Sequence, residues 1–269
     1  MKYDYVIAGA GIIGLTIARE LKRRYPEAKI AVIEKESDVA KHASGRNSGV
    51  LHAGFYYTAD SLKAKFTRDG NAAMKQYCEQ NGLKINYCGK LVVASNEAEV
   101  KGLEELKRRA EKNGVELNWV SKEEMERIDP NVRSVEKALY SPNTASVDPV
   151  EVCQHMKADI MRSGVEMFFE TGYVRHNGKA IETSKATYEC DYFINAAGLY
   201  ADKIAQDYGF GTTYTIIPFK GIYLKYAKNK TDVQTNIYPV PDLKNPFLGV
   251  HFTKTVDGSI KIGPTAIPA

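Results

Sequence analysis

The sequence is poor in cysteine and has no long apolar run. None of its four cysteines (Cys78, Cys88, Cys153 and Cys190) forms a C-x-x-C pair, which argues against a zinc or thioredoxin-like site. We interpret them as reduced, mostly buried thiols of a cytoplasmic protein. No apolar run approaches the roughly 20 residues that span a bilayer. A first strand predicted from residue 3 argues against a cleavable signal, so we expect a cytoplasmic location.

The sequence also lacks a concentrated basic region. Its formal net charge is +4, and its basic residues form only short local clusters, such as Lys107-Arg108-Arg109. A nucleic-acid partner would favour many Lys and Arg residues on one element, so we exclude that class. The mild basic excess suits an anionic cofactor and an anionic small-molecule substrate. Peripheral contact with the inner face of the cytoplasmic membrane stays open.

The first part of the chain has the pattern of a strand, a helix and a second strand. Residues 3–9 are apolar enough for a buried strand, residues 12–24 have helical periodicity, and residues 29–34 form another apolar run. Two strands joined by one helix in so short a segment predict a right-handed βαβ unit.

A glycine motif stands at the first strand-to-helix junction of this unit. Gly9, Gly11 and Gly14 match G-x-G-x-x-G. They permit a tight turn, close approach to a pyrophosphate, and close packing of helix on strand. Phosphates are stabilised at a helix N-terminus by free N–H groups and the helix dipole. Glu34 stands where a carboxylate accepts hydrogen bonds from ribose hydroxyls, which favours a dinucleotide without a 2′-phosphate.

The segment after the second strand favours FAD over NAD. Residues 36–58 are rich in Ser, Gly, Asn and His and show no clear periodicity, which is typical of a functional segment. Its small residues and backbone N–H groups can surround a pyrophosphate, and Arg46 can meet a phosphate.

The rest of the chain predicts two interleaved domains of an α/β protein. We expect helices over 61–81, 97–112, 148–163 and 199–207, and a short helix begun by a capping box at Ser121 and Glu124. Residues 212–263 read as successive strands. The prediction is a Rossmann-like FAD-binding domain (1–82 and 146–207) and an α+β substrate domain on a mixed or antiparallel sheet (83–145 and 208–269).

Several longer motifs carry a family resemblance. They are Arg46–Tyr57, Ser61–Ala64, Gly89–Leu91, Ala196–Leu199, Ala201–Asp202, Pro218–Gly221, Ile237–Pro241, Pro246–Thr253 and Gly263–Pro264. In these residues the sequence resembles flavoproteins of the D-amino-acid-oxidase/glycerol-3-phosphate-dehydrogenase superfamily. Within it, the sequence is most similar to the L-2-hydroxyglutarate oxidase/dehydrogenase family.

The resemblance implies an FAD cofactor and oxidation of a 2-hydroxy acid to a 2-oxo acid, with hydride transfer to flavin N5. It also implies that a strand containing Val174 packs near the adenine. The predicted cofactor-binding residues are then Gly9, Gly11, Ile12, Ile13, Gly14, Glu34, Lys35, Ser44, Arg46, Asn47, Ser48, Gly49, Val50, Val174, Ala196, Ala197 and Gly198.

The sequence departs from the family pattern in two ways. The family usually has Arg where Lys220 stands, and Lys lacks the bidentate fork that binds a carboxylate. Family members also continue beyond the position of Ala269, with a last segment that returns to the flavin domain. We therefore expect this chain to be C-terminally truncated.

The proposed chemistry needs a base for the hydroxyl proton and partners for substrate carboxylates. Histidine has a suitable pKa, and we select His52, beside the small residues of the flavin-side loop, and then His251 in the substrate sheet. Lys220 is the candidate cation for a substrate carboxylate, and we group it with the predicted catalytic residues. Candidate substrate-binding hydroxyls belong to Tyr57, Tyr223 and Tyr238.

Alternatives remain at the level of sequence. One is a related amino-acid, amine or glycerol-3-phosphate oxidoreductase with FAD, and another is a truncated chain without activity of its own. The electron acceptor, oxygen or a quinone, is not readable from the residues.

Overall fold

The computed structural model describes residues 1–228, 230–242 and 249–269 and divides the chain into two compact units. Unit 1 comprises Met1–Asn47 and Pro149–Pro218, and unit 2 comprises Ser48–Asp148 and Phe219–Ala269. Pro246, Phe247 and Leu248 of the family motif lie outside the described residues.

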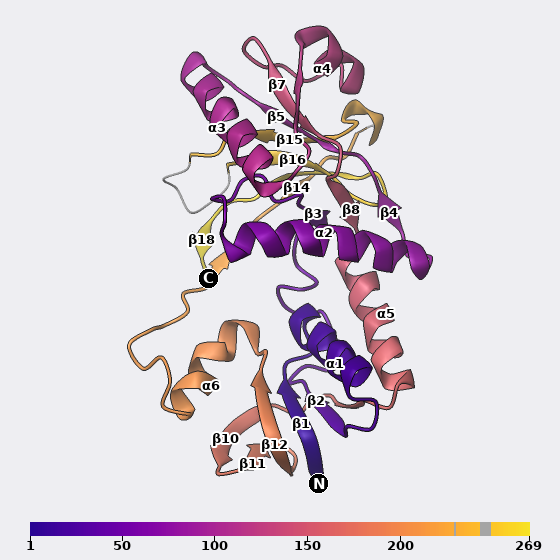
Figure 1. Cartoon of the computed structure of the whole chain (residues 1–269), viewed down its shortest axis with the longest axis vertical. Helices are drawn as coiled ribbons and strands as arrows, with labels where there is room; N and C mark the ends of the chain where they lie inside the picture. The colour runs from indigo at the N-terminus through magenta and orange to yellow at the C-terminus, as the bar shows by residue number, and fades with distance from the viewer. Residues whose placement is uncertain (229, 243–248) are drawn as a thin grey trace. The chain divides into compact units, whose positions relative to one another are not determined.

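Unit 1 is built on one six-stranded sheet with the order β10-β11-β12-β1-β2-β9 (Figure 1). Strands β12, β1, β2 and β9 are parallel, whereas β10 and β11 are antiparallel. The strands are β1 (Lys2–Ala8), β2 (Ile30–Ile33), β9 (Glu166–Phe168), β10 (Tyr173–Asn177), β11 (Ala180–Thr183) and β12 (Thr187–Asn195). The helices are α1 (Ile12–Arg24), α5 (Pro149–Arg162), the 3-10 helix η1 (Gly198–Tyr200) and α6 (Ala201–Asp207).

The predicted βαβ unit is confirmed as β1, α1 and β2. All four residues of β2 are buried, as expected for a parallel strand covered on both faces. Helices α1 and α5 pack against each other. Because β12, β1, β2 and β9 run parallel, their carboxyl ends lie at one edge of the sheet, where α/β proteins bind ligands.

Unit 2 is built on a seven-stranded mixed sheet with the order β14-β17-β16-β15-β5-β7-β6. Only the pairing of β15 with β5 is parallel within it. Its strands are β5 (Lys90–Val93), β6 (Asn118–Val120), β7 (Ala138–Ser141), β14 (Leu224–Lys225), β15 (Asn236–Pro239), β16 (His251–Lys254) and β17 (Ile260–Gly263). The predicted mixed sheet is confirmed.

Smaller sheets and helices complete unit 2. Strand β8 (Ala145–Val147) pairs with β3 (Val50–Leu51) and β4 (Ile85–Asn86), and β13 (Phe219–Lys220) pairs with β18 (Ile267–Pro268). The helices are α2 (Leu62–Gln80), α3 (Glu97–Asn113), α4 (Lys122–Ile128) and the 3-10 helix η2 (Lys230–Asp232).

Local sequence signals explain where the helices of unit 2 begin and end. Ser61 and Asn96 accept hydrogen bonds from backbone N–H groups in the first turns of α2 and α3. The capping box predicted at Ser121 is confirmed, with both reciprocal hydrogen bonds formed. Gly114 ends α3 in the left-handed conformation, with φ of 64°.

The units divide the chain differently from the predicted domains. Residues 48–82 lie in unit 2, whereas the sequence assigned them to the cofactor domain. The physical reason is pairing and packing: β3 pairs with β8, and α2 packs against α3 and β4. The irregular segment 36–58 therefore crosses from unit 1 to unit 2 between Asn47 and Ser48.

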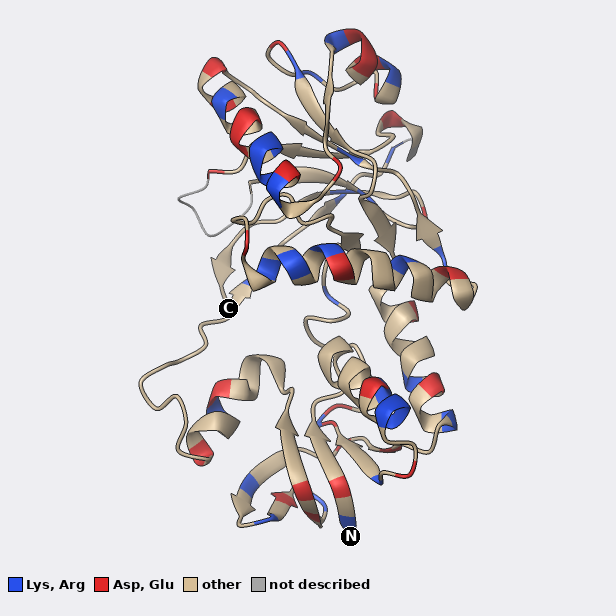
Figure 2. Cartoon of the chain, viewed as in Figure 1, with Lys and Arg blue, Asp and Glu red and all other residues tan. Residues whose placement is uncertain are grey.

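Charge of both signs is spread over the helices. Figure 2 shows Lys and Arg interspersed with Asp and Glu along α3, where Glu105 pairs with both Arg108 and Arg109. Among the described residues, no helix is both long and apolar enough to cross a membrane.

Candidate functional site

A cavity of about 790 Å³ lies within unit 1 at the carboxyl ends of β1, β2 and β12. Its volume falls in the range of small-molecule and cofactor sites. Its walls include Gly9, Gly11, Ile12, Ile13, Glu34, Lys35, Ser44, Asn47, Val174, Ala196, Ala197 and Gly198. All twelve were predicted as cofactor-binding residues from the sequence, and the structure brings them together around one space.

The glycine turn is packed so closely that side chains would not fit. Gly9 has φ of +105°, and a Cβ there would lie 2.4 Å from the Ala196 carbonyl oxygen. A Cβ on Gly14 would lie 1.9 Å from the Gly9 carbonyl oxygen. Gly14 does not line the cavity. Its role is the close packing of α1 onto β1, whereas Gly11 stands at the cavity wall.

The N-terminus of α1 points its backbone toward this cavity. Gly11 is the N-cap in an extended conformation and offers no capping side chain. The Ser44 hydroxyl oxygen accepts a hydrogen bond of 3.0 Å from the Ile12 N–H, and both residues line the cavity. A helix start of this kind favours a phosphate group.

Glu34 is held in place at the end of β2. Its Oε2 accepts a hydrogen bond from the Ala10 N–H at 2.7 Å, and its Oε1 accepts one from the Glu36 N–H at 3.0 Å. A carboxylate has about four lone-pair sites, so it retains acceptors for ribose hydroxyls. Two backbone hydrogen bonds fix its orientation in the absence of a ligand.

A charged network borders the same cavity. Lys35 and His42, which line it, both contact Glu36, and the pKa of Glu36 is lowered to about 2 by Lys35 and then His42. Asp207, which also lines the cavity, accepts hydrogen bonds from Tyr173 and His176. Tyr173 and then His176 lower its pKa to about 2.

The residues present fit FAD. The glycine cradle and the α1 N-terminus suit a pyrophosphate, and Glu34 suits a ribose. Four large apolar side chains are 48–61% exposed and line the cavity: Ile13, Val174, Leu199 and Tyr200. Exposed apolar side chains around a cavity are typical of a site for an aromatic ligand.

Besides Gly14, four predicted cofactor residues do not line this cavity. Arg46 is exposed, and Ser48, Gly49 and Val50 belong to unit 2. Val50 instead pairs with Ser146 of β8.

Unit 2 contains a second group of candidate functional side chains, centred on Lys90. This lysine begins β5, and no part of it is exposed to solvent. Its Nζ lies 2.9 Å from Nδ1 of His52, a half-buried residue directly after β3, and 4.0 Å from the ring centre of Tyr238. A lysine is almost never fully buried without a specific reason.

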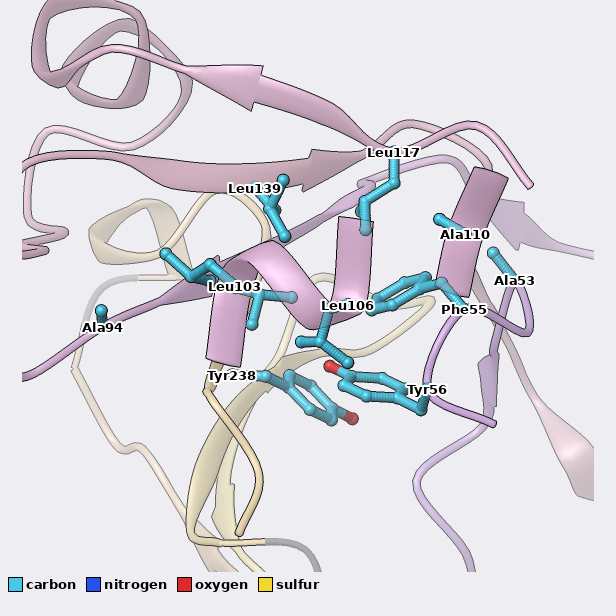
Figure 3. Close-up of a cluster of buried hydrophobic side chains, with 11 residues drawn as sticks. Ala53, Phe55, Tyr56, Ala94, Leu103, Leu106, Ala110, Leu117, Leu139 and Tyr238 are labelled. Atoms are coloured by element: carbon cyan, nitrogen blue, oxygen red, sulfur yellow. The ribbon is translucent and has the colours of Figure 1, made fainter. Parts of the chain in front are cut away.

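Tyr238 and His251 extend this group across the sheet. Their rings stack 3.7 Å apart, and His251 Nδ1 lies 2.8 Å from the Gly249 carbonyl oxygen. The carbonyl accepts, so Nδ1 carries the proton of the neutral ring. Figure 3 shows Tyr56 and Tyr238 entering the adjoining apolar cluster from separate segments. The buried Tyr56 hydroxyl has no hydrogen-bond partner within the described part of the chain.

Burial disfavours the charged forms of the basic groups in this cluster. It lowers the pKa of Lys90 from 10.5 to about 7 and that of His251 from 6.5 to about 4. It also lowers the pKa of His52 well below 6.5, and the nearby Lys90 and His251 add to that effect. Two histidines with free lone pairs near neutral pH can accept a proton from a substrate hydroxyl.

The predicted catalytic and substrate residues separate into two sets. His52, His251 and Tyr238 belong to the group around Lys90, which we call the Lys90 cluster. Burial raises the pKa of Tyr238, and the nearby Tyr223 adds to that effect. Tyr57 packs at the edge of the apolar cluster, with Lys63 Nζ 4.5 Å from its ring centre. Lys220 is exposed on β13, and no contact found among the described residues joins it to His52.

The sequence analysis did not select Lys90 as a site residue. Gly89–Leu91 entered only as part of the family resemblance. A signal was present, because a lysine starting the apolar run Lys90-Leu91-Val92-Val93 is unusual in a buried strand.

Comparison with known protein families gives a match along nearly the whole chain. The profile of the family described as FAD dependent oxidoreductase (DAO) matches residues 4–269.

Two relatives share the name L-2-hydroxyglutarate dehydrogenase. An L-2-hydroxyglutarate dehydrogenase of Escherichia coli (strain K12) is 39% identical over 273 residues, which is 99% of this chain and 64% of that protein. The mitochondrial L-2-hydroxyglutarate dehydrogenase of Homo sapiens is 39% identical over 285 residues, 99% of this chain and 61% of that protein. The chain thus spans less than two thirds of these relatives, consistent with the expected truncation.

Solved structures share the fold. An L-alpha-glycerophosphate oxidase from Mycoplasma pneumoniae with FAD bound has a TM-score of 0.83 and 25% identity, covering 99% of this chain and 72% of its own. A glycine oxidase from Geobacillus kaustophilus has a TM-score of 0.82 at 20% identity, covering 100% of this chain and 72% of its own. The predicted Rossmann-like α/β class is confirmed.

Proposed function

The chain belongs to the FAD dependent oxidoreductase (DAO) family, and from this premise we propose that it oxidises L-2-hydroxyglutarate to 2-oxoglutarate. The observation that carries the proposal is the Lys90 cluster: two histidines kept neutral by burial, His52 directly after β3 and His251 on β16, beside a buried lysine. The names of these relatives, at 39% identity, support this choice of substrate. Related glycerophosphate and amino-acid oxidoreductases share the fold and are the alternatives.

FAD, when bound, supplies the acceptor for the hydride that leaves the substrate carbon. The residues that would hold it are those of unit 1: the backbone of Gly9 to Ile12 for the pyrophosphate, and Glu34 for a ribose. The cofactor needs no catalytic side chain from unit 1 in this scheme, because the protein there binds and orients it.

His52 is the proposed proton acceptor. It is half-buried, whereas His251 is only 3% exposed, with Nδ1 bonded to the Gly249 carbonyl. Removal of the hydroxyl proton by a neutral imidazole makes the adjacent C–H bond a better hydride donor. His251 then serves as a neutral neighbour that holds Tyr238 by stacking.

The two carboxylates of the substrate require cationic or hydroxyl partners. We propose Lys220, Tyr57 and Tyr223 for this role. The sequence also offered Tyr238, whose ring stacks on His251. Tyr223 has the best support, because its phenol is close to Tyr238. Lys220 offers one ammonium where the family has a guanidinium, so its carboxylate contact would be monodentate.

The test is anaerobic reduction of the FAD-loaded protein, followed through the visible flavin absorbance. L-2-hydroxyglutarate should bleach it, and D-2-hydroxyglutarate, glycerol 3-phosphate and glycine should not. Bleaching by glycerol 3-phosphate or an amino acid alone would contradict the proposed substrate. A protein that stays colourless after incubation with FAD would show that this length of chain has no activity of its own.

The same sample identifies the electron acceptor. After reduction, air or a water-soluble quinone is added and the return of absorbance is timed. Quinone-dependent reoxidation would support peripheral membrane location, whereas rapid reoxidation by air would support an oxidase.

A further inference from the structure

Lys90 lies in a setting that does not balance its charge. Strand β5 lies between β15 and β7, and Lys90 is paired in register with Asn236 and Ser141. No Asp or Glu in the described part of the chain forms an ion pair with it. Removal of an ammonium from water without a counter-charge is strongly unfavourable, so the charged form is disfavoured at this position.

Within the described part of the chain, the titratable side chain at hydrogen-bond distance from Lys90 Nζ is His52. Nζ and Nδ1 are 2.9 Å apart, and this distance permits two arrangements of protons. A charged Lys90 donates to Nδ1, which places the imidazole proton on Nε2. A neutral Lys90 accepts from Nδ1–H, which leaves Nε2 with a free lone pair.

The two arrangements differ in chemistry. An imidazole with its proton on Nε2 cannot accept another proton there, whereas one with its proton on Nδ1 can. The protonation state of Lys90 thus determines whether Nε2 of His52 can accept a proton.

We propose that Lys90 is a positioning residue that sets the tautomer of His52. This inference rests on the proposed function, in which His52 accepts the substrate hydroxyl proton. When that proton reaches Nε2, the Nδ1 proton passes to the neutral amine of Lys90. One O–H bond and the Nδ1–H bond break, and one Nε2–H and one Nζ–H bond form, so the proton taken from the substrate is held as the Lys90 ammonium.

The surroundings of Lys90 place this change near neutrality. The groups facing it are Phe55, Tyr56, Cys88, Tyr238 and His251. The aromatic rings stabilise an ammonium by cation–π attraction, which is smaller than the cost of burying it. Burial raises the pKa of the Cys88 thiol, so it stays neutral. Burial therefore dominates and lowers the pKa of Lys90 to about 7.

The test reads the tautomer directly and does not need substrate or flavin. The full chain is labelled with ¹⁵N-histidine, and the ring signals of His52 are identified by their loss in His52→Gln. Their chemical shifts are followed from about pH 5.5 to 9, which spans the ordinary titration of histidine. The wild-type ring should change from the Nε2–H to the Nδ1–H form with a midpoint of about pH 7.

Variants of Lys90 separate its charge from its bulk. Lys90→Met should abolish the pH-dependent change of tautomer. Lys90→Arg stays charged throughout this range and should keep the Nε2–H form at every pH. Lys254→Met is the matched control: Lys254 is also buried in this sheet, but its Nζ donates to the Val233 carbonyl oxygen, so His52 should titrate as in the wild type.

A single tautomer of wild-type His52 across the whole range would overturn the proposal, even if neither Lys90 variant folds. So would a pH-dependent change in Lys90→Met that equals the wild type. These outcomes are independent of substrate oxidation: bleaching by L-2-hydroxyglutarate with a fixed tautomer removes the role of Lys90 alone. A changing tautomer without bleaching by any 2-hydroxy acid removes the proposed function instead.

Discussion

The cavity of unit 1 and the Lys90 cluster of unit 2 are built from different chemical groups. The cavity depends on backbone: glycines without room for a Cβ, a helix N-terminus and one carboxylate held by N–H groups. The cluster depends on ionisable side chains removed from water, with Lys90 and His251 at 0% and 3% exposure. Binding of a large anionic cofactor is therefore a matter of shape, whereas proton transfer is a matter of desolvation.

The largest effect should come from a methyl group in the glycine turn. In Gly14→Ala, the new Cβ would lie 1.9 Å from the Gly9 carbonyl oxygen, so α1 must move away from β1. We expect a loss of at least about 4 kcal/mol in the free energy of unfolding and no FAD binding. Chemical denaturation and flavin absorbance measure both. Gly178→Ala, with φ of +58° but open space, should cost only about 1 kcal/mol; equal losses would contradict the packing argument.

The next effect separates chemistry from cofactor binding. His52→Gln should lower the rate of flavin reduction by L-2-hydroxyglutarate about 10²–10⁴-fold, as loss of a general base does. FAD affinity should be unchanged, because His52 does not line the unit 1 cavity. Stopped-flow absorbance gives the rate. A smaller loss in His52→Gln than in His251→Gln would reverse the assignment of the base.

A third prediction concerns pH and the stability of unit 2. The pKa of His251 is lowered from 6.5 to about 4 in the folded protein, so the unfolded chain binds more protons between these values. Stability should therefore fall as pH falls from 6.5 toward 4, by about 3 kcal/mol from this group. Urea unfolding at several pH values measures it. His251→Gln should flatten this part of the curve, and an unchanged slope would contradict the burial argument.

The smallest effect should come from removing one charge at the ribose position. Glu34→Gln keeps an oxygen to accept from the Ala10 N–H but makes weaker hydrogen bonds to hydroxyls. We expect FAD affinity to fall about 5–30-fold, or about 1–2 kcal/mol. Calorimetry gives the dissociation constants. Glu36 does not line the cavity, so Glu36→Gln should bind FAD as the wild type does.

The same contrast explains what the sequence could predict. The βαβ unit, its glycines and Glu34 were predictable because each follows from local spacing and periodicity. The capping box at Ser121 was predictable for the same reason. Strands β7, β8 and β11 were not identified from the residues, because short strands lack periodicity of their own and depend on long-range partners.

Lys90 shows the limit most clearly. Its position in the sequence is visible, but its burial depends on β15, far along the chain, and its partner His52 comes from another segment. Nothing local to residues 89–93 indicates that these three elements meet. The domain boundary at residue 82 was displaced for a similar reason, since the pairing of β3 with β8 is remote in sequence.

The parallel pairing of β15 with β5 has a consequence for the order of folding. Lys90 of β5 is in register with Asn236 of β15, and the whole second segment of unit 1 is synthesised between them. Every residue that lines the unit 1 cavity precedes residue 208. On the ribosome, the nucleotide site can thus assemble while β5 still waits for its neighbour, because domains form as their segments emerge. Closure of that long loop makes the Lys90 cluster a late product of folding.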